Sequence, residues 1–319
     1  MFLRTMGVIP LQTQYKKPEP IVNTPIEDIR AKMKVFDKDI DIPNFLCYKF
    51  DVITPVRNQG SVCGTCWAFV VAEIIGDRIS VQKNRPIILS PQGLIQCFDF
   101  PKGCQGASPE RVFEWMEKTN YKLPFEFDLP YKQERSSTMS GICPNLRGVN
   151  IKEKSIARLT DPLPDHVFVK NTASDQEKKT LSNNIQNMKK ELILKGPFFA
   201  TIKVYDDLLS HIDDKPYFSN FKGTVVGGHA IEIVGYCEPG VDLRKKFEKG
   251  YWICKNTWGV TWPPKSKTPG YFTIAMGVNM CGVESRCASV EPNIDIKPLQ
   301  GDVAYTNWKK YAAEFIVRK

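Results

Sequence analysis

The sequence predicts an α+β protein with a mostly helical domain followed by a β-rich one. Helical apolar spacing follows Cys66 in the run WAFVVAEIIGDRISV, which has no helix breaker before Gly76. Two β-type apolar runs come much later, at 229–236 and 251–255. The chain has 319 residues, of which 42% are hydrophobic, and this length accommodates two subdomains in one fold.

The first 41 residues are polar and punctuated by proline. Residues 24–27 (TPIE) are a capping-box signature with Pro25 at the first helical position. Apolar residues then follow at roughly helical spacing as far as Phe36. A helix this short needs a surface on which to dock. Taken alone, the pattern fits a structural N-terminal arm.

We expect residues 42–146 to form the helical domain and residues 147–290 the β-rich domain. A long helix is predicted in the second domain near 175–195, where Gly196 and Pro197 end it. Residues 291–319 form a C-terminal extension. Four of its side chains fall on one helical face, namely Trp308, Tyr311, Ala312 and Phe315. A helix packed on the body fits this pattern, and a membrane-surface or partner helix is the alternative.

Cys66 stands at a loop-to-helix junction within the run NQGSVCGTCWAF. The positive end of the helix dipole at such a position favours the thiolate over the thiol. The thiolate is the form of cysteine that acts as a nucleophile. The run therefore makes Cys66 a candidate catalytic residue.

Cys63 and Cys66 also make a CxxC pair, for which a redox pair or half of a zinc site is the alternative interpretation. A thioredoxin-type pair should follow a strand within a small βαβ unit, and no such pattern precedes Cys63. A zinc site needs a second ligand pair, and the other Cys residues do not repeat the spacing. We therefore expect no metal site and no cofactor.

A cysteine nucleophile needs a base, and the base needs an orienting group. The three His residues are His166, His211 and His229. Only His229 follows a Gly-Gly turn and begins a β-type run, so small residues leave room beside its ring. Asn256 ends the next apolar strand, and a hairpin of the two strands would bring both side chains together.

Taken alone, each of these two residues has an ordinary structural interpretation. A His before a strand is more often structural than catalytic, and an Asn after a strand is usually a turn former. The order Cys66, His229, Asn256 with these flanking residues is what favours catalysis.

Eight motifs together resemble the papain family of cysteine proteases over roughly residues 42–290: TPVRNQG, CGTCWAF, LSPQGLIQC, GCQG, GGHAIEIVGY, KNTWG, GYFTIAMG and CGVES. GGHAI and CGVES resemble the cathepsin B branch in particular. The resemblance implies a papain-like two-domain fold, with a helical domain, a β-barrel-like domain and the active-site cleft between them. It also implies a cysteine peptidase that acts on protein or peptide substrates.

The resemblance assigns a role to each catalytic candidate. Cys66 would be the nucleophile, and His229 would be the general base and acid. Asn256 would hold the orientation of the imidazole, and Trp258 would shield that hydrogen bond from water. Gln59 would form the oxyanion hole with the backbone N–H of Cys66, and each such donor lowers the barrier by roughly 3–4 kcal/mol.

Two disulfides follow from the family pattern, Cys63–Cys104 and Cys97–Cys143. The pairing of five further Cys residues stays unassigned: Cys47, Cys237, Cys254, Cys281 and Cys287. The total of ten Cys favours an oxidising compartment. The start of the chain shows no clear signal peptide. A lysosome-like, vacuolar or particle-packaged protein fits both observations better than a cytosolic one.

Two departures from the family pattern lie near the expected site. The family's GCNGG run is GCQGA here, so Ala107 follows Gly106 and adds a methyl group where substrate backbone approaches. Val62 adds one residue between Gln59 and the nucleophile, which displaces Gln59 from its usual spacing. Because both changes perturb the cleft, a catalytically weak or silent papain-fold binding protein is the alternative function.

The resemblance also carries expectations about substrates and regulation. Arg286 occupies the position at the bottom of the S2 pocket, where it would favour an acidic substrate side chain. The stretch 120–143 is short and has no His, so we expect an endopeptidase without the occluding loop of cathepsin B. Residues 1–41 would be an inhibitory pro-segment, which makes the protein a zymogen.

Charge and hydropathy limit the other partners. The net charge is +9, but the Lys and Arg residues are scattered without a compact basic-aromatic repeat. We therefore expect a solvated basic surface and no nucleic-acid partner. No apolar run approaches the length of a membrane span, so no transmembrane segment is expected.

Overall fold

The computed structural model describes residues 45–48, 52–61, 63–83, 86–98, 103–132, 143–164, 167–212, 215–219, 221–239, 250–264, 266 and 268–294. The expected helix at 24–36 and the apolar face at 308–315 lie outside these residues. The described chain forms two compact units, one β-rich and one helical. The β-rich unit comprises 45–48, Val56–Ser61 and Ala157–Ser289, and the helical unit comprises 52–55, 63–156 and 290–294.

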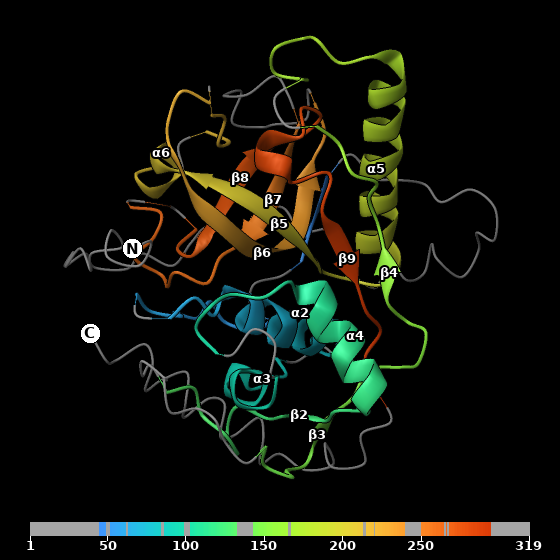
Figure 1. Cartoon of the computed structure of the whole chain (residues 1–319), viewed down its shortest axis with the longest axis vertical. Helices are drawn as coiled ribbons and strands as arrows, with labels where there is room; N and C mark the ends of the chain where they lie inside the picture. Colours follow the sequence, from blue (N-terminus) through green and yellow to red (C-terminus); the bar gives the residue numbers. More distant parts are fainter. Residues whose placement is uncertain are drawn as a thin grey trace. The chain divides into compact units, whose positions relative to one another are not determined.

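The β-rich unit is built on one antiparallel sheet (Figure 1). Within the described residues its strands follow the order β4-β9-β5-β6-β7-β8, and β1 pairs with β6. The strands are β1 (Phe45–Cys47), β4 (Ala157–Arg158), β5 (Phe198–Tyr205), β6 (Val225–Cys237), β7 (Tyr251–Lys255), β8 (Tyr271–Ala275) and β9 (Cys287–Ser289). In the described part of the chain no pairing joins β4 to β8, so the sheet is not a closed barrel.

The centre of the sheet is buried on both faces. Nine consecutive residues of β6, from His229 to Cys237, are buried, and so is every residue of β7 and β8. Near-continuous burial is typical of a strand that is covered on both sides. His229 and Asn256 were expected to come together through the pairing of two consecutive strands. This pairing is confirmed, because β6 and β7 are antiparallel neighbours in the sheet.

Helix α5 (Asp175–Leu194) runs beside the β4 and β9 edge of the sheet (Figure 1). Ser174 and Glu177 close a full capping box at its start, which satisfies two backbone N–H groups. Glu191 accepts a hydrogen bond from Ser289 of β9 at 2.7 Å, so the helix is tied to the sheet through buried polar atoms. This helix confirms the prediction for 175–195. The described residues of this unit also include two short helices, α6 (Asp206–Leu209) and the 3₁₀ turn η2 (Met280–Gly282).

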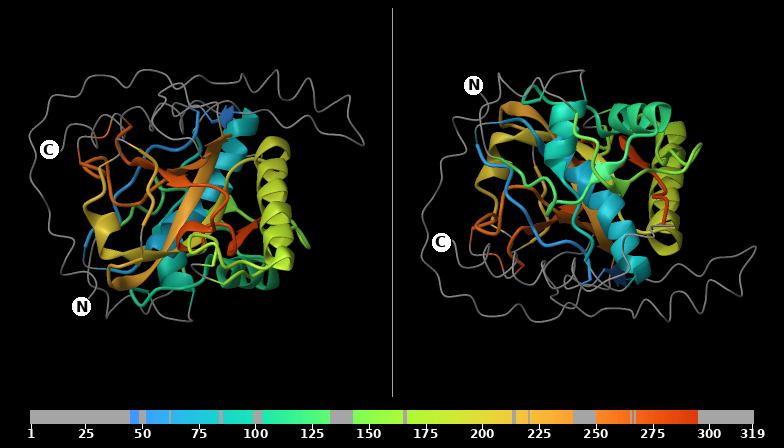
Figure 2. Two further views of the ribbon diagram at one scale, coloured as in Figure 1. Left: turned by 90° about the horizontal axis from the view of Figure 1, so that it is seen from above. Right: turned by 90° about the horizontal axis from the view of Figure 1, so that it is seen from below.

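The helical unit contains α2 (Cys66–Lys83), α3 (Pro91–Cys97) and α4 (Pro109–Thr119), with a small ladder of β2 (Leu123–Pro124) and β3 (Gly148–Val149). Figure 2 shows α2 in blue and the neighbouring helices in teal. All residues of α2 from Trp67 to Val81 are buried, as expected for a helix with apolar residues on every side. The predicted helix after Cys66 is thus confirmed.

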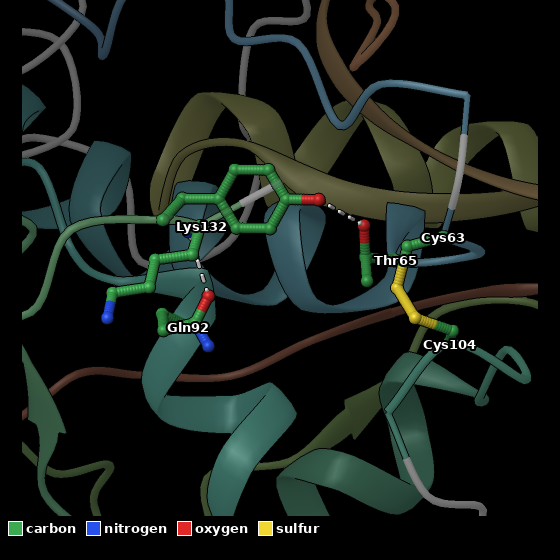
Figure 3. Close-up of a disulfide and its surroundings, with 6 residues drawn as sticks. Cys63, Thr65, Gln92, Cys104 and Lys132 are labelled. Carbon is green, nitrogen blue, oxygen red and sulfur yellow. Dashed lines mark hydrogen bonds between the residues drawn. A yellow bond between two sulfur atoms is a disulfide. The ribbon is translucent and has the colours of Figure 1, made fainter. Parts of the chain in front are cut away.

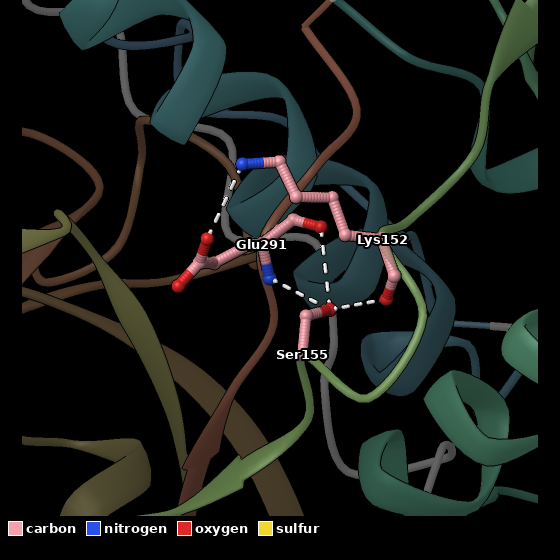
Figure 4. Close-up of polar contacts among 3 residues, drawn as sticks. All are labelled: Lys152, Ser155 and Glu291. Carbon is pink, nitrogen blue, oxygen red and sulfur yellow. Dashed lines mark hydrogen bonds and ion pairs between the residues drawn. The ribbon is translucent and has the colours of Figure 1, made fainter.

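The residues that follow Ser289 belong to the helical unit. Glu291 accepts from the Lys152 ammonium group at 3.4 Å, and its backbone N–H donates to Ser155 Oγ at 3.3 Å (Figure 4). Ser155 Oγ also donates to the carbonyl of Lys152 at 2.6 Å. These contacts anchor the chain at the point where the C-terminal extension begins.

Within the described residues, no helix is both long and apolar enough to cross a bilayer. The same residues contain no group of three or more His, Cys, Asp or Glu side chains that could hold a metal ion.

Candidate active site

His229 and Asn256 meet in the β-rich unit. His229 lies on β6, and Asn256 directly follows the last residue of β7. The register pairs Glu232 with Lys255, which sets the two site residues near the same end of the strand pair. His229 Nε2 lies 2.8 Å from Asn256 Oδ1, within hydrogen-bonding distance. Both side chains are buried.

The backbone of Thr257 fixes the tautomer of His229. Its N–H group donates to Asn256 Oδ1 at 2.8 Å. A backbone N–H can only donate, so the atom that receives it is the Asn256 carbonyl oxygen. Because the same oxygen faces His229 Nε2, this ring nitrogen must carry a proton. In the neutral imidazole the lone pair then lies on Nδ1.

Trp258 covers the imidazole. Its ring stacks on that of His229 with 4.6 Å between centroids and 29° between planes. Trp262 packs edge-on against Trp258 at 4.8 Å and donates its indole N–H to the carbonyl of Leu209 at 3.2 Å. The shielding ring is therefore itself held from behind.

Burial sets the charge state of the imidazole. Removal from water lowers the pKa of His229 to about 4, although the hydrogen bond to Asn256 acts in the opposite direction. The ring by itself is thus neutral at neutral pH. A negative charge placed close to it is required to stabilise the imidazolium form.

Gln59 lies on a short extended segment beside Thr257. The backbone N–H of Gln59 donates to the Thr257 carbonyl at 2.8 Å, and Thr257 Oγ1 donates to Gln59 Oε1 at 2.6 Å. Asn58 and Trp258 form an isolated antiparallel bridge next to this contact. Backbone and side-chain hydrogen bonds to Thr257 therefore hold Gln59 in place. These bonds do not depend on the number of residues between Gln59 and Cys66. Val62, the extra residue in that spacing, lies outside the described residues.

Cys66 is the first residue of α2 in the helical unit, and its side chain is partly exposed. The first residues of a helix have backbone N–H groups without intrahelical partners, which together attract negative charge. Thr65 precedes Cys66. The Thr65 carbonyl accepts a hydrogen bond from the Ala68 N–H at 2.9 Å, and this bond begins the helix. Cys66 takes part in neither disulfide.

The Cys63–Cys104 disulfide holds the loop before Cys66 (Figure 3). Gly64 donates its N–H to the Cys104 carbonyl at 3.1 Å, and a Cβ on Gly64 would come within 2.8 Å of that oxygen. Only glycine fits here without movement of the backbone. Since Cys63 is bonded to Cys104, it is not available for a CxxC redox pair with Cys66.

A second disulfide, Cys97–Cys143, joins the end of α3 to the residue that follows the undescribed stretch 133–142. Both disulfides are the pairs that the family pattern implies. The five Cys residues whose pairing stayed unassigned are all buried and outside disulfides.

Gly106 and Ala107 continue from Cys104 and are partly exposed. Gly106 has φ +81°, in the left-handed region that favours glycine, and a Cβ there would meet no atom within 4 Å. Gln105 bridges to Gly64, two residues before the nucleophile candidate. The predicted substrate-binding residues of the helical unit thus lie on the segment that supports the Cys66 loop.

Arg286 has its backbone fixed and its side chain exposed. Its carbonyl accepts from the Thr201 N–H at 3.0 Å, and the residues on either side of it are buried. Glu284 does not pair with it, because this buried carboxylate accepts from Trp252 Nε1 at 2.9 Å and from two backbone N–H groups at 2.7 Å. Among the described residues, none forms an ion pair with Arg286.

The β-rich unit therefore gathers four of the predicted site residues, His229, Asn256, Trp258 and Gln59, and the helical unit holds Cys66 with Gly106 and Ala107. Thr257, which contacts both Asn256 and Gln59, was not among the residues predicted from the sequence. Its only sequence signal is a hydroxyl residue between Asn256 and Trp258.

Comparisons with known proteins identify the family to which the chain is similar. Residues 40–290 match the model of the papain family cysteine proteases. "Cathepsin B-like cysteine proteinase 5" of Caenorhabditis elegans is 29% identical over 297 residues, which cover 87% of this chain and 79% of that protein. "Cathepsin B-like CP2" of Giardia intestinalis is 29% identical over 257 residues, which cover 78% of this chain and 74% of that protein. The solved structure of proCathepsin B S9 from Trypanosoma congolense has a TM-score of 0.61 at 20% identity and covers 92% of this chain and 89% of that chain.

Proposed function

Since the chain belongs to the papain family of cysteine proteases and is cathepsin B-like, we propose that it hydrolyses peptide bonds with Cys66 as nucleophile and His229 as base. Family membership confirms the expected α+β papain-like fold and the class of cysteine peptidase. The observation that supports the proposed roles best is the His229–Asn256 hydrogen bond beneath Trp258. That bond leaves Nδ1 of His229 as the basic nitrogen.

In the proposed reaction, Nδ1 of His229 takes the proton of the Cys66 thiol. The resulting thiolate attacks the substrate carbonyl carbon and forms a tetrahedral intermediate. The imidazolium then gives its proton to the leaving amine as the peptide C–N bond breaks, which leaves an acyl-enzyme. A water molecule, deprotonated by His229, attacks the acyl carbon, and the thiolate departs with the acid product released.

Thiolate and imidazolium stabilise each other in this scheme. Burial alone keeps His229 neutral, because its pKa is lowered to about 4. A thiolate beside the ring would raise that pKa, and the positive end of α2 would favour the thiolate. The ion pair, rather than either residue alone, is therefore the catalytically active form.

The oxyanion of the intermediate needs donors that are already in place. We assign this role to the side-chain amide of Gln59 and to the backbone N–H of Cys66, which is the first residue of its helix. The Thr257 contacts of Gln59 support the assignment, because they hold this amide in a defined position.

We further propose that the enzyme is an endopeptidase made as a zymogen. The stretch 120–143 has no His to bind a substrate C-terminus, and residues 133–142 of it lie outside the described residues. Residues 1–41 would cover the site until autoprocessing near residue 40. The two disulfides suit an oxidising, lysosome-like, vacuolar or particle-packaged compartment. N-terminal sequencing after incubation at mildly acidic pH tests the processing step, and an unclipped chain with full activity contradicts it.

A peptide library hydrolysed by the wild type and by Cys66→Ala tests the central proposal. We expect Cys66→Ala and His229→Ala to abolish hydrolysis, and Asn256→Ala to weaken it less, since Asn256 only orients the ring. An epoxide inhibitor should modify the wild type once, at Cys66, because the other five Cys residues outside disulfides are buried. Full activity of Cys66→Ala would refute Cys66 as the nucleophile. No hydrolysis and no modification of the wild type would instead favour a silent binding protein.

A further inference from the structure

We infer that Thr257 is a positioning residue that sets the orientation of the Gln59 carboxamide. The inference rests on the proposed function, in which that carboxamide donates to the oxyanion. It concerns the Thr257 hydroxyl, which contacts Gln59 and would act on the reaction through that residue.

Two hydrogen bonds link this pair of residues. Thr257 Oγ1 donates to Gln59 Oε1 at 2.6 Å, and Gln59 N–H donates to the Thr257 carbonyl at 2.8 Å. Both residues are buried, with relative exposures of 0% for Thr257 and 4% for Gln59. Hydrogen bonds shielded from water in this way are stronger than exposed ones. One residue thus holds both the backbone and the side chain of Gln59.

The orientation matters because a carboxamide has two ends of nearly the same shape and opposite polarity. With the Gln59 oxygen turned toward the Thr257 hydroxyl, the NH₂ end points away from Thr257 and can donate elsewhere. A half-turn of the amide would present an oxygen at the same place, and an oxygen repels a developing oxyanion. The hydroxyl therefore favours the productive orientation.

Thr257 is also tied to the base. Its backbone N–H donates to Asn256 Oδ1, the atom that faces His229. The backbone link is independent of the side chain, so a substitution that removes only the hydroxyl leaves it in place. This separation lets one experiment distinguish an effect on Gln59 from an effect on His229.

The experiment compares Thr257→Val, which keeps the shape and removes the hydroxyl, with Thr257→Ser, which keeps the hydroxyl. For Thr257→Val we expect kcat and kcat/KM to fall together by about tenfold, with KM within about twofold, as for an interaction made in the transition state. The pH profile should not move, because the Thr257 N–H bond to Asn256 persists. Thr257→Ser should recover most of the rate.

Thr273→Val is the matched control. Thr273 is buried in the same unit, and among the described residues its hydroxyl has no hydrogen-bond partner. The same isosteric change there should leave kcat/KM as in the wild type. If Thr257→Val does not fold, Thr257→Ala removes the same hydroxyl and carries the same expectation.

A double-mutant cycle with Gln59→Ala gives the decisive result. If Thr257 acts through Gln59, the Thr257→Val change costs nothing further in the Gln59→Ala background. An equal loss in both backgrounds, or an unchanged rate for Thr257→Val in the wild type, overturns the inference while Gln59 keeps its proposed role. An unchanged rate for Gln59→Ala itself refutes the proposed oxyanion role, and the inference with it.

Discussion

Glu232 and Lys255 face each other across β6 and β7 as an ion pair from which water is fully excluded. The carboxylate and ammonium groups lie 3.2 Å apart, and both side chains have 0% exposure. They are direct partners in the strand register, next to the irregularity between Ile233 and Gly235. Since a slip of one residue would turn the carboxylate and ammonium groups to opposite faces, the pair helps to fix the register that joins His229 to Asn256.

Removal of one member of this pair should be strongly destabilising. We expect Lys255→Met to lower the free energy of unfolding by about 3–5 kcal/mol, because Glu232 is left as a buried charge that has lost its counter-ion. Urea unfolding followed by far-UV circular dichroism measures the change in midpoint at constant slope. The double variant Glu232→Leu with Lys255→Met removes both charges and should recover most of the loss. If the double variant is as unstable as Lys255→Met, the uncompensated charge is not the cause.

The low pKa of His229 predicts a loss of stability in acid. Folding lowers this pKa from 6.5 to about 4, so between these values the unfolded chain binds a proton that the folded chain does not. Stability is therefore full above pH 6.5, falls as the pH drops, and is lower by about 3 kcal/mol below pH 4, at about 1.4 kcal/mol for each pKa unit.

Cys66→Ala is the suitable background for this measurement, because no thiolate can then raise the pKa of His229. Urea midpoints at several pH values between 4 and 7.5 should give a steeper decline for Cys66→Ala than for the same protein with His229→Gln. If the urea midpoints of the two proteins decline equally with falling pH, His229 is not the cause of the acid destabilisation. Direct titration of the His229 ring by NMR in the Cys66→Ala protein should give a pKa well below 6.5.

Two glycines near the nucleophile should respond to alanine for different reasons. Gly64→Ala pushes a methyl group to 2.8 Å from the backbone oxygen of Cys104, which a disulfide holds in place. We expect about 1–3 kcal/mol of destabilisation and a lower kcat, since displacement of the Cys66 loop disturbs the attack geometry. Thermal unfolding and peptide hydrolysis measure the two effects.

Gly106→Ala is the comparison for Gly64→Ala. The added methyl group meets no atom within 4 Å, so its cost is the strain of φ +81°, about 1–2 kcal/mol. Gly106→Ala should therefore lower the stability of the protein. It should not lower kcat as Gly64→Ala does, because Cys66 is not displaced. A wild-type kcat for Gly64→Ala would contradict the steric argument.

The sequence predicted the elements that have strong local signals. The helix after Cys66 is a continuous apolar run, and the observed helix α2 extends two residues past its end, to Lys83. The helix at 175–195 has a clear stop signal at Gly196 and Pro197, and α5 ends within one residue of the prediction. The contact of His229 with Asn256 followed from two consecutive apolar strands, which pair as neighbours.

Non-local contacts set the limits of that prediction. The segment Val56–Ser61 belongs to the β-rich unit, although its position in the sequence predicted a place in the helical domain with Cys66. The reason is its ladder with residues 257–259, almost two hundred positions away in the chain, which no local pattern announces. The role of Thr257 was missed for the same reason, because a Thr after a strand looks ordinary until its partner across the ladder is known.

The last prediction concerns the residue that the enzyme prefers at P2, the second position before the scissile bond, and Arg286 carries it. The family resemblance assigns Arg286 to the S2 pocket, and its side chain is exposed while its backbone is held by the Thr201 N–H. An exposed guanidinium attracts a carboxylate only weakly, by about 0.2–1 kcal/mol, and salt screens the attraction. We therefore expect a several-fold preference for P2 Glu over P2 Arg at low ionic strength, and a smaller one near 0.5 M salt.

Arg286→Glu should reverse this preference, and Arg286→Gln should remove it, because only the sign of the charge differs among the three proteins. The measurement is kcat/KM for two peptides that differ only at P2, each at low and at high salt. Glu284 cannot mask the effect, since its carboxylate is buried and accepts three N–H donors of its own. A P2 preference that is the same in all three proteins would place the S2 pocket elsewhere. A preference that changes with the substitution but not with salt would instead indicate a desolvated, bidentate contact made only when substrate is bound.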